Sequence, residues 1–207
     1  MLIKFSQFKS LFFFGITFCI VMVCGLALGQ VSLAQSSLAA RVDLVGADIT
    51  GTLFLTQQEN GLVRIRGTIQ GDPARLTPGL HGLHIHSVGV CEPDAQPPFS
   101  TSGGHFDPGP FGSEVPVEAN HPYHLGDLPN LLVDEQGYAT YNTLTSRVTL
   151  SESPTTLFDD NGSAIIIHQL TDQQKAGGTA AEAGGGRIAC GVVIRDDSSA
   201  QSNRSSS

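Results

Sequence analysis

The stretch LHGLHIH, residues 80–86, contains three histidines, and the last two, His84 and His86, are two positions apart and each follow an aliphatic residue. Side chains of an extended strand alternate between its two faces. We therefore expect His84 and His86 on one face of a strand, and Leu83 and Ile85 on the other face, in a core. Two imidazoles at this spacing can bind one copper or zinc ion. The alternative is a strand whose polar face carries histidines without a metal, and the rest of the chain decides between the two.

The composition is that of a loop-rich β protein with one domain of ordinary size. The 207 residues include 24 Gly, 11 Pro and no Trp, and glycine and proline are the strongest markers of turns. This length suffices for a single core. The formal net charge of −8 argues against a nucleic-acid partner.

Residues 1–34 are typical of an export signal. Lys4 and Lys9 precede an almost wholly apolar run at residues 11–28, and Ser-Leu-Ala at 32–34 offers a cleavage site, with Ala-Leu-Gly at 27–29 as a second candidate. The apolar run is long for a signal peptide, so an uncleaved membrane anchor is the alternative. We expect an exported protein, periplasmic or extracellular, that contacts a membrane only if this segment is retained.

Cysteine usage agrees with export. Cys19 and Cys24 leave with the N-terminal segment, and Met22 and Val23 make the surroundings of Cys24 a poor match to a lipidation site. The remaining pair, Cys91 and Cys190, predicts a disulfide in an oxidising compartment. Two separate buried thiols are the alternative.

Short apolar or alternating runs separated by turn signals predict an all-β sandwich or barrel. The expected extended segments are residues 41–47, 50–57, 62–70, 80–86, 131–133, 138–143, 146–150, 163–168 and 188–194. We expect the domain to span residues 41–195, after a linker at 35–40 and before a polar, serine-rich tail at 196–207 that is predicted to be disordered.

Two long loops, residues 87–128 and 169–186, are expected to carry the chemistry on this scaffold. The first contains the sequences GGHFDP and HPYHLGD, and the second of these places His121, His124 and Asp127 at three-residue intervals. Two imidazoles and a carboxylate suit zinc, which takes four ligands in a tetrahedron. His105, in GGHFDP, is the candidate for the fourth ligand.

Five motifs occur together in this chain: HGLHIH, GGHFDP, HLGD, IIH followed by Asp172, and GGRIACGV. Together, and in this order, they resemble the copper–zinc superoxide dismutase family over roughly residues 40–194. The resemblance implies an immunoglobulin-like Greek-key β-barrel or sandwich, with the metals outside the barrel beneath the two long loops.

The resemblance also implies a role for each matched residue. The copper ligands would be His84, His86, His105 and His168, and the zinc ligands His105, His121, His124 and Asp127. His105 would bridge one copper and one zinc ion per chain as an imidazolate. Asp172 would orient a ligand of each metal by accepting hydrogen bonds. Arg187 would lie over the copper and attract an anion, and a Cys91–Cys190 disulfide would tie the first long loop to the last strand.

One region departs from the family pattern. The family has a histidine–glycine pair early in the zinc loop, but residues 108–120 of this chain read PGPFGSEVPVEAN, without histidine. His121 is the remaining candidate for that ligand. The alternative is that His121 is an ordinary loop residue and the zinc site is weaker.

Three further residues have positions in the pattern. Gly82 and Gly103 fall at its glycine positions, and His81 falls where the family has no ligand, which predicts a structural role. Lys175 is near Arg187 in the sequence, but its loop is too irregular for its place relative to the copper to be predicted.

The activity implied by the resemblance is dismutation of superoxide, 2 O2•− + 2 H+ → O2 + H2O2, through a redox cycle of copper with a zinc-supported bridging histidine. The competing hypothesis is a non-catalytic copper- and zinc-binding module, a metal store or carrier. A store needs neither Arg187 nor a bridging histidine, and all four copper ligands are present. The oligomeric state is left open, a homodimer included.

Overall fold

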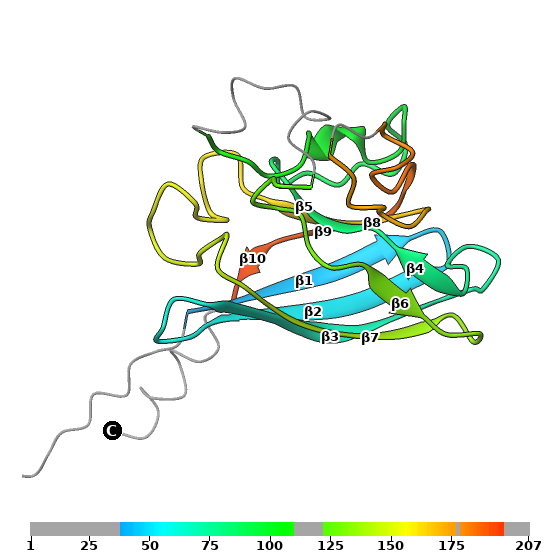
Figure 1. Cartoon of the computed structure of the whole chain (residues 1–207), viewed down its shortest axis with the longest axis horizontal. Coiled ribbons are helices and arrows are strands. Elements are labelled where there is room, and N and C mark those ends of the chain that lie inside the picture. The colour runs from blue at the N-terminus through cyan, green and yellow to red at the C-terminus, as the bar shows by residue number, and fades with distance from the viewer. Residues whose placement is uncertain (1–37, 110–121, 177–178, 197–207) are drawn as a thin grey trace, which may run out of the picture. The chain divides into compact units, whose positions relative to one another are not determined.

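A computed structural model describes residues 38–109, 122–176 and 179–196 (Figure 1). In those ranges the chain forms β-strands and one short 3₁₀ helix, η1 (Ser100–Ser102). The strands are β1 (Ala39–Gly46), β2 (Ile49–Gln57), β3 (Val63–Gly71), β4 (Gly79–His81), β5 (Leu83–His86), β6 (Leu131–Val133), β7 (Tyr138–Thr145), β8 (Ala164–His168), β9 (Arg187–Val192) and β10 (Ile194–Arg195).

Eight strands form one antiparallel sheet in the order β5-β8-β9-β1-β2-β3-β7, with β10 paired to β1. Strands β4 and β6 pair separately. The neighbours β5–β8, β9–β1 and β3–β7 are far apart in sequence, which is the crossover pattern of Greek-key folds. The sheet curls on itself (Figure 1), so the expected all-β Greek-key fold is confirmed.

Alternation along the strands builds a single main core. On β3, for example, Val63 and Ile65 are fully buried, whereas Arg64 is half-buried and Arg66 is exposed. The hydrophobic core cluster takes residues from every strand except β4 and β10. Each fully buried aliphatic side chain contributes about 1.5–3 kcal/mol relative to exposure. This core makes the sheet a rigid support for the loops at its β5–β8 edge.

Two sequence expectations about strands were wrong. Residues 80–86 do not form one strand, because Gly82 separates β4 from β5 and its N–H donates to the carbonyl of Leu170 instead of a strand partner. Residues 146–150 form no strand either; Thr149 makes only an isolated bridge to Thr156. The other expected strands are present, with ends within two residues of the predicted ones.

The predicted signal at residues 1–34 and nearly all of the predicted tail lie outside the described residues. Among the described residues, no helix is long and apolar enough to cross a bilayer.

Candidate metal centre

Strand β5 presents its two histidines as the alternation predicts. Leu83 and Ile85 lie in the main core, and His84 and His86 are fully buried on the opposite face. The described parts of the β5–β6 loop (residues 87–109 and 122–130) and of the β8–β9 loop (residues 169–176 and 179–186) lie at this edge of the sheet and cover the second face (Figure 1).

Two further histidines come from neighbouring backbone. His168 ends β8, the hydrogen-bonded neighbour of β5, and follows a register shift after Ile167; such irregularities re-aim a side chain. His105 makes an isolated antiparallel bridge with His86. One ring nitrogen from each of four buried or half-buried histidines lies within 4.8 Å of the others; the four are His84, His86, His105 and His168.

The outer ring nitrogens of these histidines are held by acceptors. Nδ1 of His86 lies 3.0 Å from the carbonyl of Gly103, and Nδ1 of His168 lies 3.0 Å from the carbonyl of Gly185. A carbonyl can only accept, so each Nδ1 carries the hydrogen and each Nε2 carries a lone pair. Partners of this kind fix the tautomer and the ring orientation of metal-binding histidines.

The two Nε2 atoms, each with a lone pair, lie close together. Nε2 of His86 and Nε2 of His168 are 3.4 Å apart, and neither can donate while both Nδ1 atoms do. Burial, with the nearby cationic groups, lowers the pKa of both rings well below the ordinary value. Protonation of one ring is therefore unfavourable and does not relieve the repulsion between the two lone pairs. A cation between the two atoms removes the repulsion, and neutral imidazoles are the form that binds a metal. The donor set therefore fits a copper-type ion.

A second group lies on the other side of His105. It consists of His105, His124 and Asp127, with one ligand-type atom from each within 4.8 Å of the others. Oδ1 of Asp127 lies 2.7 Å from Nδ1 of His105, and Oδ2 lies 2.9 Å from Nδ1 of His124. Burial alone would raise the pKa of Asp127, but these hydrogen bonds outweigh it and hold the pKa well below the ordinary range. The carboxylate and two imidazoles suit zinc.

His105 belongs to both groups, as the bridging prediction requires. Burial lowers its pKa to about 4, against the opposing effect of Asp127, so the ring is neutral at pH 7. His121 lies outside the described residues, and its role stays a prediction.

Asp172, predicted to orient ligands, accepts a hydrogen bond from His84, whose Nε2 lies 2.9 Å from Oδ2 of the carboxylate. Both side chains are almost fully buried. The N–H of Gln174 donates to Oδ1 at 2.6 Å, so both carboxylate oxygens are used. Asp172 is thus positioned to fix the His84 ring.

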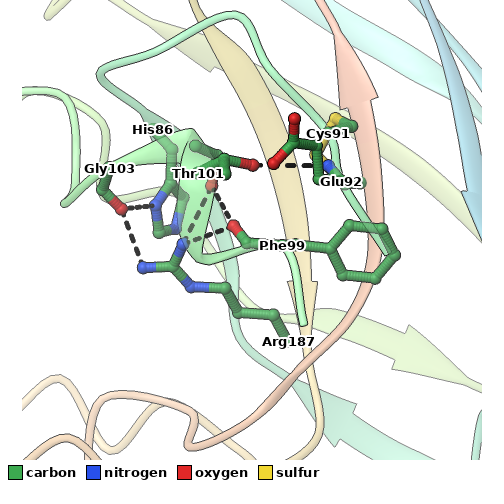
Figure 2. The surroundings of a disulfide bond; sticks show 9 residues. His86, Cys91, Glu92, Phe99, Thr101, Gly103 and Arg187 are labelled. Carbon is green, nitrogen blue, oxygen red and sulfur yellow. Dashed lines mark hydrogen bonds between the residues drawn. A yellow bond between two sulfur atoms is a disulfide. The ribbon is translucent and has the colours of Figure 1, made fainter. Parts of the chain in front are cut away.

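Arg187, the first residue of β9, lines the same cavity as His86, His105 and His168; the cavity volume is about 520 Å³. Its guanidinium donates to the carbonyls of Phe99 and Gly103, both at 2.7 Å (Figure 2). Partial burial lowers the pKa of Arg187, but a guanidinium stays charged in proteins. A fixed positive charge therefore faces the cavity that the histidines line.

The predicted Cys91–Cys190 disulfide is confirmed. It lies in a small second core beside Phe99 (Figure 2), together with Ala164 and Ile166 of β8. The bond therefore attaches the start of the β5–β6 loop to β9, three residues beyond Arg187.

Two other expectations concern residues near the site. In the buried His81, Nδ1 lies 2.8 Å from the carbonyl of His168 and Nε2 lies 2.7 Å from the carbonyl of Thr77. These contacts fit its predicted structural role. Nζ of Lys175 lies 2.6 Å from Oε1 of Glu182, so its charge is balanced locally. Arg187 is thus the better candidate for attracting an anion.

The carbonyls of Phe99, Gly103 and Gly185 were not identified from sequence as parts of the site. The signal for Gly103 was its glycine position, and its φ of 76° is one that L side chains rarely adopt. Nothing in the residue type of Phe99 marks its carbonyl, because any residue carries one.

Comparison with known proteins gives consistent matches. The family model described as copper/zinc superoxide dismutase matches residues 49–193. The chain is 34% identical to the superoxide dismutase [Cu-Zn] of Photobacterium leiognathi over 196 residues, 91% of this chain and 99% of the relative. It is 34% identical to superoxide dismutase [Cu-Zn] 2 of Brassica juncea over 149 residues, 70% of this chain and 89% of the relative.

Two solved structures share the fold. A double mutant of a SOD-like protein from Bacillus subtilis superposes with a TM-score of 0.60 at 29% identity, covering 74% of this chain and 96% of that one. The clock protein EA4 superposes with a TM-score of 0.56 at 27% identity, covering 77% and 96%. Proteins with such different names share the fold, so the fold alone does not determine function and the site residues do.

Proposed function

Since this chain belongs to the copper/zinc superoxide dismutase family, we propose that it catalyses 2 O2•− + 2 H+ → O2 + H2O2 with one copper and one zinc ion per chain. The observation that carries the proposal is the position of His105, which is shared by the four-histidine group and by the group with His124 and Asp127. A single imidazole between two metal-type donor sets is what a bridge requires.

In the proposed reaction, one superoxide loses an electron and becomes O2, and the other gains that electron and two protons and becomes H2O2. Bound copper supplies the one-electron couple for this exchange, whereas zinc has no redox chemistry. Arg187 attracts the anion into the cavity. The Nδ1 side of His105 faces Asp127; with zinc held there, the neutral ring would carry its one proton at Nε2 and deliver it to the product, and the second proton would come from water.

The outer contacts support this arrangement. Gly103 and Gly185 hold the Nδ1 atoms of His86 and His168, and Asp172 holds Nε2 of His84. Each inner nitrogen then faces the same point without a change of tautomer, and such contacts are worth about 10–100-fold in metal affinity.

We propose His121 as the fourth zinc ligand, because two histidines and one carboxylate leave a tetrahedral site one ligand short. His121→Ala should lower zinc affinity while copper stays bound, since His121 is in no proposed copper set. Metal analysis after dialysis against a graded chelator measures both occupancies. Unchanged zinc affinity would remove His121 from the site.

A metal store is the second candidate, and Arg187 separates it from the enzyme. Arg187→Ala should lower the second-order rate with superoxide about tenfold or more, and Arg187→Glu further, because focusing of an anion raises on-rates by about 10 to 10³. Copper content should not change, since Arg187 is not a proposed ligand. The wild-type rate should fall as salt is added, because the Debye length is about 10 Å at 0.1 M.

The matched control is Arg75→Ala, which removes the same charge from an exposed turn outside the cavity lining. It should leave both the rate and its salt slope near the wild-type values. A fully metallated Arg187→Glu protein with the wild-type rate and slope would reject steering by Arg187 and favour the store.

We also propose export to the periplasm or beyond. Support comes from the predicted signal at residues 1–34, the disulfide and the alignment with a bacterial relative over 91% of this chain. The N-terminal sequence of the protein recovered from an expressing cell tests this: a start near residue 35 agrees with cleavage, and a start at Met1 agrees with a retained anchor.

A further inference from the structure

The guanidinium of Arg187 is held by three acceptors, of which two are the carbonyls already described. The third is the hydroxyl of Ser102, which lies 2.9 Å from Nη1. Nη1 thus donates to Phe99 and to Ser102, and Nη2 donates to Gly103. A guanidinium has five N–H donors, so two remain for the cavity.

Ser102 is constrained to accept from Arg187. Its side chain is fully buried in η1, and Oγ lies 2.9 Å from the carbonyl of Phe99. A hydroxyl has one hydrogen, and the carbonyl of Phe99 can only accept, so that hydrogen goes to Phe99. The lone pairs of Oγ therefore face Nη1.

We propose that Ser102 is a positioning residue: its buried hydroxyl takes the second N–H of Arg187 Nη1 and thereby sets the direction of the two N–H groups left for superoxide. The inference rests on the proposed steering role of Arg187. The Phe99 and Gly103 carbonyls alone leave one Nη1 hydrogen without an acceptor at a half-buried position, which favours rotation of the guanidinium toward water in the cavity.

The backbone around Ser102 is rigid enough for this task. Phe99 has a left-handed conformation, with a φ of 58°, which is uncommon for a bulky residue and persists only where the surroundings enforce it. Its ring packs beside the Cys91–Cys190 disulfide, and its carbonyl accepts from Arg187, from Ser102 Oγ and from the Ser102 N–H at 3.2 Å. Ser102 and Phe99 thus form one acceptor unit for Nη1.

The first test is Ser102→Ala in the fully metallated protein, with Thr101→Val as the matched control. Thr101 is the preceding residue of η1, and its Oγ1 accepts from the Glu92 N–H at 3.3 Å instead of contacting Arg187 (Figure 2). Ser102→Ala should lower the second-order rate roughly three- to tenfold, less than the full 10- to 10³-fold effect of focusing because the charge of Arg187 is kept, at unchanged copper and zinc content. Thr101→Val should keep the wild-type rate.

The second test separates positioning from a general structural effect. In an Arg187→Ala background, Ser102→Ala should cause no further loss of rate, because residues that act as a unit are non-additive. An equal loss in both backgrounds would overturn the proposal.

The third test needs no activity. In the metal-free wild-type chain, restricted rotation should give Arg187 separate ¹⁵Nη signals by NMR, and in Ser102→Ala these signals should merge, while in Thr101→Val they should stay separate. Separate, unshifted signals in Ser102→Ala would overturn the role of Ser102 whatever the enzyme assays give. If the metallated wild type is instead inactive, the proposed function fails while this test still decides whether Ser102 holds Arg187.

Discussion

His86→Gln is expected to reduce superoxide decay to the spontaneous rate while zinc stays bound. His86 contributes one of four imidazoles around a single point, and its Nε2 lies 3.4 Å from Nε2 of His168. Glutamine is of similar size, but its amide offers no imidazole nitrogen, which is the donor that suits copper. His86 is not in the group with His124 and Asp127, so the zinc affinity of that group should not change.

The matched variant is His124→Gln, which should have the opposite metal content. His124 lies in the second group only, so zinc should be lost and copper kept. Elemental analysis of both variants, alongside decay of a superoxide pulse, measures the two effects. If His86→Gln retains copper and the wild-type rate, the four-histidine group is not the catalytic site.

Replacing both cysteines, Cys91→Ala with Cys190→Ala, should cause the largest loss of stability of any change considered. The bond joins residues 99 apart, and the chain-entropy model gives roughly 4–5 kcal/mol for a loop of about a hundred residues. Urea unfolding of the metal-free protein measures the free energy without a contribution from bound metal. A loss below about 1 kcal/mol would contradict the chain-entropy account.

The cysteine variant should also release copper faster. The disulfide fixes the start of the β5–β6 loop, and the Gly103 carbonyl of that loop holds both His86 and Arg187. A loosened loop therefore frees a ligand ring and the guanidinium together. Copper transfer to a chelator, followed with time, measures this, and Thr101→Val serves as a control for change within the same loop.

Much of the fold follows from local sequence. Residues 62–70 were predicted to be extended and form β3 almost to the residue, and the spacing of His84 and His86 predicted which face of β5 carries the histidines. These are period-two patterns, and burial of one face is enough to determine them. The break between β4 and β5 at Gly82 was not predicted, because it depends on a hydrogen bond to Leu170, a residue of the β8–β9 loop.

The site, like the fold, combines residues that the sequence predicted with contacts that it did not. The residue types and motif order pointed to His105, His168, Asp127 and Arg187, and the structure brings all four to the same end of the sheet. The groups that accept hydrogen bonds from these side chains were not predicted. Ser102 accepts from Arg187 because the fold brings η1 and β9 together, and its neighbours in sequence do not indicate this contact. Side-chain identity predicts possible ligands, whereas the contacts that orient them depend on tertiary structure.

The most direct test of the account is reconstitution of the metal-free wild-type chain with copper alone, zinc alone, both, or neither, followed by elemental analysis and superoxide decay on the same samples. The account predicts one copper and one zinc ion per chain in the doubly loaded protein, and catalysis that requires copper and weakens as salt is added. A doubly loaded protein at this stoichiometry that leaves superoxide decay at the spontaneous rate would contradict it.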